Sequence, residues 1–177
     1  IEKVRHDPSL KLSTPVKATK TAAKIGGRQV YLDFRETFTV DELLKCMMIF
    51  SANDVAFLTA EFLSNGEVDK FVQHMNERAA EMGLRNTRFR TPNGLPPATG
   101  DEDMSTAREM AFLAAQLHSF PEVVKWSSTW LAYIRENSDR FDPFQLVNTN
   151  RLIRECPGVD GMKTGYTDAA GYCITAT

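Results

Sequence analysis

The sequence predicts an α+β domain in which a helical lobe is combined with an antiparallel sheet flanked by helices. Three observations support this class. The middle of the chain carries apolar residues at helical spacing, its end carries aromatic and β-branched residues bounded by Gly and Pro, and turn residues gather densely only at 91–100 and 155–161. Because neither turn-rich stretch is long enough to be an interdomain linker, residues 1–177 are expected to form a single domain.

The first helix is predicted after a short irregular region. Residues Val16 to Leu32 alternate brief apolar and polar segments around Gly26-Gly27, which favours a surface loop or small hairpin. Thr39 then lies three residues before Glu42, the spacing of a capping box in which each residue satisfies a backbone N–H at the start of a helix. A helix is therefore expected from Val40 to about Phe50.

Two further helices follow. The apolar run Val55 to Leu63 predicts the next helix and leaves Ser51 to Asp54 at the junction of two helices, where side chains can project into a cleft. A third helix is indicated by Val68, Phe71, Val72, Met75, Ala79 and Met82. Gly83 is suited to the left-handed position that ends it.

The remaining elements are shorter. Thr106 and Glu109 form a second candidate capping box before an apolar run to Leu117, and Pro121 suits the first turn of another short helix. Residues 129–134 and 161–176 carry the aromatic and β-branched residues typical of strands, so they are expected to supply the antiparallel sheet.

Composition excludes several kinds of protein. The chain is 42% hydrophobic and 25% charged, as in ordinary globular domains, and its 21 basic and 23 acidic residues offer no basic excess for nucleic acid. No apolar run approaches the roughly 20 residues of a membrane-spanning helix. Cys46, Cys156 and Cys173 lack the spacing of a zinc or redox site, so we expect buried apolar thiols and no metal.

Two short motifs are candidates for chemistry. Lys163-Thr164-Gly165 places a cation, a hydroxyl and a missing side chain together at the start of a strand, where they can hold a carboxylate and a peptide backbone. The triplet alone is common, and so is Ser51-Ala52-Asn53, which can be a simple helix cap. Their order matters, because S-x-N followed by K-T-G is the pair found in β-lactamases and penicillin-binding proteins.

Long segments around both motifs resemble the low-molecular-mass penicillin-binding D,D-carboxypeptidases, a family of serine D-alanyl-D-alanine carboxypeptidases. The matching stretches are DELLKCMMIFSANDVAFLTAE at 41–61, FVQHMNERAAEMGLRNTRFRTPNGL at 71–95, MSTAREMA at 104–111 and VDGMKTGYTDAAGY at 159–172. The resemblance implies the transpeptidase fold of these proteins and acyl transfer, in which a serine attacks the bond between two terminal D-alanines of a peptidoglycan stem peptide.

The resemblance also implies a role for each residue of the S-x-N motif and for the lysine. Ser51 would relay a proton to the leaving amine, and Asn53 would hydrogen-bond the substrate's amide carbonyl and nearby lysines. Lys163 would supply positive potential for the substrate carboxylate and for the proton relay.

The residues after the lysine would bind the substrate. Thr164 would donate a hydrogen bond to the same carboxylate, Gly165 would let the substrate backbone lie close, and the N–H of Tyr166 would be one oxyanion donor. An edge strand at 165–167 could pair with the peptide, and no metal or organic cofactor is required.

The chain departs from the family in lacking the S-x-x-K motif that carries the nucleophile and its base, since no serine is followed three residues later by lysine. Thr14 and Thr21 precede lysines at that spacing, but both fall after the position of the nucleophile helix, so we interpret them as coincidental. The expectation is a truncated central piece, inactive alone, with the nucleophile before Ile1 and the last strands after Thr177. A degenerate homologue with only a binding role is the other explanation.

Other functions remain as alternatives. A class A β-lactamase would need a deacylating glutamate shortly after the S-x-N motif, but residues 82–100 contain no Asp or Glu, which favours a carboxypeptidase. A non-enzymatic cell-wall-binding or scaffold module would use the same cleft without turnover. In an unrelated helical domain with chance triplets, Ser51 and Lys163 would not be neighbours.

The resemblance finally implies a location and partners. The parent protein would act outside the bacterial cytoplasmic membrane, in the periplasm or cell envelope, with β-lactams as inhibitors and without nucleic acid. Any membrane anchor would lie outside this chain.

Overall fold

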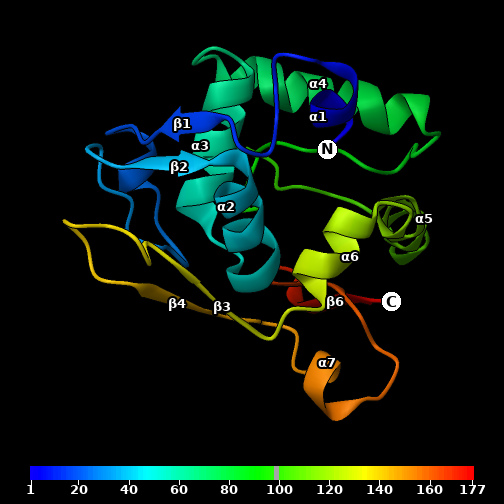
Figure 1. The fold of residues 1–177 in the computed structure, drawn as a ribbon. Coiled ribbons are helices and arrows are strands. Elements are labelled where there is room, and N and C mark those ends of the chain that lie inside the picture. Colours follow the sequence, from blue (N-terminus) through cyan, green and yellow to red (C-terminus); the bar gives the residue numbers. More distant parts are fainter. Residues whose placement is uncertain (98–99) are drawn as a thin grey trace.

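The computed structural model describes residues 1–97 and 100–177 and confirms the α+β class (Figure 1). The helices are α1 (Glu2–His6), α2 (Val40–Lys45), α3 (Asn53–Leu63), α4 (Val68–Glu81), α5 (Ala107–His118), α6 (Pro121–Ser127) and α7 (Leu152–Glu155), with a 3-10 turn η1 (Ala22–Lys24) and a π-helical turn η2 (Cys46–Phe50). The strands are β1 (Pro15–Lys17), β2 (Thr37–Thr39), β3 (Leu131–Ile134), β4 (Phe144–Val147), β5 (Met162–Thr167) and β6 (Gly171–Ala176).

Within the described residues the strands form three antiparallel pairs, β1 with β2, β3 with β4 and β5 with β6. Figure 1 shows the β3–β4 hairpin running below α2 and continuing through α7, at the lower edge, toward β5 and β6. β5 pairs with β6 in a register that places Lys163 opposite Thr175, and no described strand pairs with its other edge. The β5 edge is therefore available to an extended chain.

The helix after Thr39 confirms the first capping box. The Thr39 hydroxyl accepts from the backbone N–H of Glu42 at 3.2 Å, and the Glu42 carboxylate accepts from the backbone N–H of Thr39 at 2.8 Å. The helix continues through η2 to Phe50, the predicted end. Its buried face carries Leu43 and Ile49, which pack with Leu58 of α3 in the main core.

The prediction for Val16 to Leu32 is confirmed in part, because after β1 the segment is irregular apart from the short turn η1. It does not form a hairpin of its own, since β1 pairs with β2, which begins at Thr37. Val16 and Val30 are 2% and 0% exposed, because this segment covers the helical core instead of standing away from it.

The middle helices follow the predicted boundaries closely. α3 begins at Asn53, two residues before the first apolar residue of the predicted run, so Ser51 and Ala52 alone form the junction. α4 ends at Glu81, and Gly83 takes a φ of +76°, the left-handed conformation expected of it. α6 carries Pro121 in its first turn, as predicted.

The second capping box is only half formed. The Thr106 hydroxyl accepts from the Glu109 N–H at 3.2 Å, but the Glu109 carboxylate turns to the loop after α4 and accepts from Asn86 and Thr87 instead. The carboxylate thus joins α5 to that loop. The strands at 131–134, 162–167 and 171–176 confirm the predicted strand segments, whereas α1, α7 and β4 were not predicted.

The interpretation of the cysteines as buried thiols holds for one of the three. Cys46 is buried in the core, while Cys156 and Cys173 are exposed. Cys173 lies on β6, most of whose residues are exposed, so the burial that is usual for a free cysteine does not occur there.

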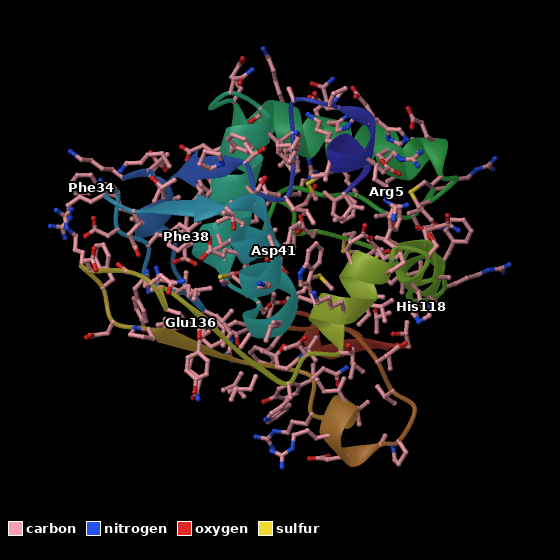
Figure 2. All side chains as sticks on the ribbon, viewed as in Figure 1. Arg5, Phe34, Phe38, Asp41, His118 and Glu136 are labelled. Atoms are coloured by element: carbon pink, nitrogen blue, oxygen red, sulfur yellow. The ribbon has the colours of Figure 1, made fainter. Side chains whose placement is uncertain are left out.

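A buried ion pair fastens the segment before β2 to the β3–β4 hairpin. Arg135 donates to the two carboxylate oxygens of Glu36 at 2.5 and 2.8 Å, and its guanidinium also donates to the backbone carbonyls of Val30 and Tyr31. The Arg135 guanidinium carbon also lies 5.7 Å from the centre of the Phe38 ring. Figure 2 labels Phe38 and Glu136, the residue after Arg135, at the left of the molecule.

Candidate active site

The two predicted motifs meet in space. Lys163 Nζ lies 2.6 Å from Ser51 Oγ, although the residues are 112 positions apart, and the same amine donates to the Thr164 carbonyl at 2.6 Å. Both side chains are partly buried. The contact excludes the reading in which the two triplets arose by chance in an unrelated helical domain.

Ser51 is positioned by an unusual end to the preceding helix. η2 is a π-helical turn, after which Ser51 takes φ +62° and ψ +42° and α3 begins at Asn53. A non-glycine residue in the left-handed region costs about 1–2 kcal/mol, and such strain persists where the surrounding structure holds it. The core packing of η2 and α3 on both sides supplies that hold. π-turns and strained residues of this kind are frequent at functional sites.

Lys163 has an altered basicity. Burial of the amine lowers its pKa from 10.5 to about 8, and the positive charge of Arg28 acts in the same direction. The amine is therefore still predominantly cationic at neutral pH but gives up its proton far more readily than an ordinary lysine. Such a group can both attract a carboxylate and take part in proton transfer.

Asn53 is held by the loop before β2 and by the loop after α4. Its backbone N–H donates to the Arg28 carbonyl at 2.8 Å. The oxygen of its side-chain amide accepts from the Arg28 N–H at 3.1 Å, and the nitrogen of that amide donates to the Asn93 carbonyl at 3.3 Å. A Cβ on Gly27, whose φ is +75°, would collide with this amide. Within the described residues Asn53 forms no hydrogen bond to Lys163, so the expected contact with a lysine stays a prediction.

Thr164 is linked to the helical lobe through Thr149. The two hydroxyl oxygens lie 2.7 Å apart, and the Thr149 N–H donates to the Ile49 carbonyl at 3.1 Å. The end of η2 thus fixes Ser51 on one side and Thr149 on the other. Sequence reasoning missed Thr149, since nothing in its spacing relates it to either motif.

Gly165 and Tyr166 lie on the open edge of β5. A Cβ built on Gly165 would meet no atom within 4 Å, so a peptide backbone can approach there. Tyr166 is exposed, its ring packs against Tyr172 at 4.8 Å between centroids, and its hydroxyl lies 3.2 Å from an Asp168 carboxylate oxygen. The edge has the form that addition of an extended peptide strand requires.

Two buried asparagines support this arrangement. Asn148 and Asn150 are 5% and 2% exposed. Asn150 Nδ2 donates to the Gly161 carbonyl at 2.8 Å, and the Asn148 amide donates to the Ser127 and Thr129 carbonyls at 2.8 Å each. The segment before Lys163 is therefore tied to the end of β4 and to α6. In the sequence, only the two asparagines that flank Thr149 indicate these hydrogen bonds, and sequence reasoning missed them.

No cluster of three metal-ligating side chains occurs in the part of the chain that the structure describes. Over the same residues, no helix combines the length and the apolar character that crossing a membrane requires.

Comparison with known proteins agrees with this geometry. Residues 1–177 match peptidase family S11, described as D-alanyl-D-alanine carboxypeptidase. The chain belongs to this family. It is 45% identical to the D-alanyl-D-alanine carboxypeptidase DacF of Bacillus subtilis over 95% of its own length and 42% of the relative's. It is 36% identical to DacC of Escherichia coli over 90% of its length and 38% of that protein. The chain thus spans about two fifths of these curated family members.

Solved structures of a D-alanyl-D-alanine carboxypeptidase and of a penicillin-binding protein share the fold. DacD of Francisella tularensis superposes with a TM-score of 0.85 at 27% identity, covering 99% of this chain and 52% of that one. Penicillin-binding protein D2 of Listeria monocytogenes, solved in an ampicillin-bound form, gives a TM-score of 0.82 at 25% identity over 99% of this chain and 68% of the other. The fold expected from the resemblance is confirmed, with this chain covering only part of it.

Proposed function

We propose that the protein containing this chain is a serine-type D-alanyl-D-alanine carboxypeptidase, which removes the terminal D-alanine from peptidoglycan stem peptides through an acyl-enzyme. The observation that carries the proposal is the 2.6 Å contact between Lys163 Nζ and Ser51 Oγ beside the open edge of β5. Membership of a family described by this activity supports it further.

The geometry suits binding of a peptide that ends in a carboxylate. The Lys163 cation and the Thr164 hydroxyl would bind that carboxylate, and the peptide would extend along β5 past Gly165, with the N–H of Tyr166 as one oxyanion donor. Asn53 would hydrogen-bond the substrate's amide carbonyl. In this pose Gly165 allows close approach, because it places no side chain between the strand and the substrate.

The chemistry would proceed in two steps. The serine oxygen bonds to the carbonyl carbon, the amide C–N bond breaks, and the proton reaches the leaving amine through Ser51 and Lys163. Water then hydrolyses the ester and restores the serine. No cofactor takes part. The reacting serine and its base are expected outside residues 1–177, since these contain no S-x-x-K motif, and the chain alone is expected to be inactive.

The proposed location is the outer side of the bacterial cytoplasmic membrane, where the substrate is found. β-Lactams are the proposed inhibitors, which the ampicillin-bound form of the Listeria protein supports by similarity. We propose no nucleic-acid partner, since basic and acidic residues nearly balance.

The test is labelling of the full-length protein with a fluorescent penicillin. We expect the full-length protein to be labelled, residues 1–177 alone not to be, and Lys163→Ala to slow labelling of the full-length protein about 100-fold or more. Ser128→Ala, at an exposed serine outside the site, is the matched control. If the folded full-length protein resisted labelling but sedimented with peptidoglycan, the carboxypeptidase proposal would be overturned. The protein would then be a cell-wall-binding module.

A further inference from the structure

Asp54, the second residue of α3, is a buried acid that the mechanism above does not use. Its exposed fraction is 0%, and within the described residues no basic side chain forms a salt bridge with it. Its carboxylate accepts instead from three backbone N–H groups, those of Val30 at 3.2 Å, Leu32 at 3.3 Å and Val55 at 2.9 Å. A fully buried acid is rare unless it is paired, so these hydrogen bonds must compensate for its burial.

Two of the three donors belong to one short loop, residues 28–32, which lies outside helix and strand. Val30 and Leu32 flank Tyr31, whose φ of +56° is in the left-handed region. Backbone N–H groups around such a residue form a concave anion-binding site, and here the anion is the chain's own Asp54 carboxylate. A left-handed tyrosine is strained, and such strain persists only where the surroundings hold it. Asp54 therefore helps to fix the shape of this loop.

The same loop orients the side chain of Asn53. The Arg28 carbonyl accepts from the Asn53 backbone N–H at 2.8 Å, and the Arg28 N–H donates to the Asn53 amide oxygen at 3.1 Å. The first two residues of α3 are thus both hydrogen-bonded to the loop 28–32. If the loop shifted, the hydrogen bond that orients the Asn53 amide would shift with it.

A simpler role for Asp54 would be to stabilise the start of α3, where the helix dipole favours an acid. That role does not require burial, since Asp69 takes the same second position in α4 and is exposed. Burial raises the pKa of Asp54, because loss of water destabilises the charged carboxylate, although the N–H donors act in the opposite direction. Retention of an acid at an unfavourable position indicates that its contacts with the loop matter.

We propose that Asp54 is a positioning residue of the candidate site, which acts through the loop 28–32 to set the orientation of the Asn53 amide. This inference rests on the proposed function, in which Asn53 hydrogen-bonds the substrate's amide carbonyl. Asp54 itself touches neither the substrate nor the reacting atoms. Its effect on the reaction must therefore pass through Asn53.

A double-mutant cycle tests this dependence, with the rate of penicillin labelling of the full-length protein as the measurement. Asp54→Asn keeps the size of the side chain but turns an NH2 group toward backbone N–H donors, so it should slow labelling about tenfold by misplacing Asn53. In an Asn53→Ala background no amide remains to be oriented, so Asp54→Asn should slow labelling by less than about twofold. A purely structural role would give the same factor in both backgrounds.

Two substitutions on α4 serve as controls. Asp69→Asn removes an acid from the same position of a helix and should leave the labelling rate unchanged. Ala79→Gly, at a buried position, lowers stability without touching the loop 28–32 and should leave the labelling rate of the folded protein unchanged. The NMR signals of the Asn53 side-chain amide should move in Asp54→Asn and stay in place in both controls.

Hydrogen exchange of the unmodified full-length protein gives a measurement that does not depend on whether a variant folds. The Val30 and Leu32 amides should exchange at least about 100-fold more slowly than freely exposed amides, although they lie outside regular secondary structure. Fast exchange of both amides would show that the carboxylate does not hold the loop, and the positioning role would be overturned.

The outcomes separate the positioning role from the underlying function. Labelling that Asp54→Asn does not slow, or slows equally in both backgrounds, would overturn the positioning role and leave the carboxypeptidase intact. Absence of labelling of the unmodified full-length protein would overturn both. A slowing by Asp54→Asn that disappears in the Asn53→Ala background supports the positioning role.

Discussion

Arg135 and Glu36, 99 residues apart, form an ion pair with two hydrogen bonds in which the side chains are only 9% and 5% exposed. Arg135 takes a φ of +65°, an unfavourable backbone conformation for a non-glycine residue, at the turn where it reaches Glu36. The same guanidinium holds the carbonyls of Val30 and Tyr31, shortly after Arg28 in the sequence. The pair therefore stabilises the loop whose backbone holds Asn53.

Removing one partner of this pair should be costly. Arg135→Met leaves the Glu36 carboxylate buried and without its cation, so we expect the free energy of unfolding to fall by about 3–5 kcal/mol. Urea unfolding of the full-length protein, followed by tryptophan fluorescence, measures it. Arg140→Met, at an exposed position, is the control. A loss below about 1 kcal/mol for Arg135→Met would show that the pair contributes little.

The lowered pKa of Lys163 predicts a specific pH dependence. Below pH 8 the amine is protonated in both the folded and the unfolded protein. Between about 8 and 10.5 the unfolded chain keeps the proton and the folded chain has released it. The contribution of Lys163 to stability should therefore rise with pH across this window. Anion binding should weaken over the same range, because the cation is lost.

Carbon NMR of labelled lysine side chains tests this directly, with Lys163→Met to assign the signal. One lysine should titrate near 8, well before the others. If that signal moved only near 10.5, the amine would be more solvated than the structure indicates.

Gly27 and Gly26 offer a matched pair of substitutions. Gly27→Ala adds a Cβ that collides with the Asn53 amide, at a left-handed φ of +75°, whereas a Cβ on Gly26 would meet nothing within 4 Å. We expect Gly27→Ala to lower stability by about 1–2 kcal/mol from backbone strain alone and to slow penicillin labelling of the full-length protein. Gly26→Ala should change both by little. Equal effects of the two substitutions would contradict the close packing of Asn53.

The three thiols should differ sharply in reactivity. Burial raises the pKa of the Cys46 thiol well above its usual range, while Cys156 and Cys173 are exposed. A thiol-reactive dye should therefore label Cys156 and Cys173 in the native protein and Cys46 only after denaturation. Mass spectrometry of the labelled peptides identifies the sites. Rapid native labelling of Cys46 would mean that the core around η2 opens readily.

The sequence was informative where structure is local. The Thr39 and Glu42 capping box, the left-handed Gly83 and the helical start at Pro121 depend on residues within a few positions of one another, and each prediction was confirmed. The Thr106 and Glu109 pair had the same pattern but formed only half of the box, because Glu109 found partners on another loop. Tertiary contacts can override a local signal in this way.

The candidate site divides in the same manner. Ser51 and Lys163 could be recognised because they belong to motifs, and the structure brings them together. Thr149, Arg28 and the partners of Asn53 could not be recognised, since they are defined by the way distant loops fold against each other. The pairing of β1 with a strand 20 residues later was missed for the same physical reason.

The π-turn at Cys46–Phe50 makes the site depend on the number of residues as well as on their identity. A π-turn takes up one more residue than the corresponding α-helical turn. If Leu44 were deleted from α2 and the π-turn kept its geometry, everything after the deletion would rotate by about 100° around the helix axis. Ser51 would then no longer face Lys163, although both residues and both motifs would be intact. An insertion or deletion here is therefore more damaging to the site than most substitutions, and homologues aligned across this turn are best compared by length before they are compared by residue type.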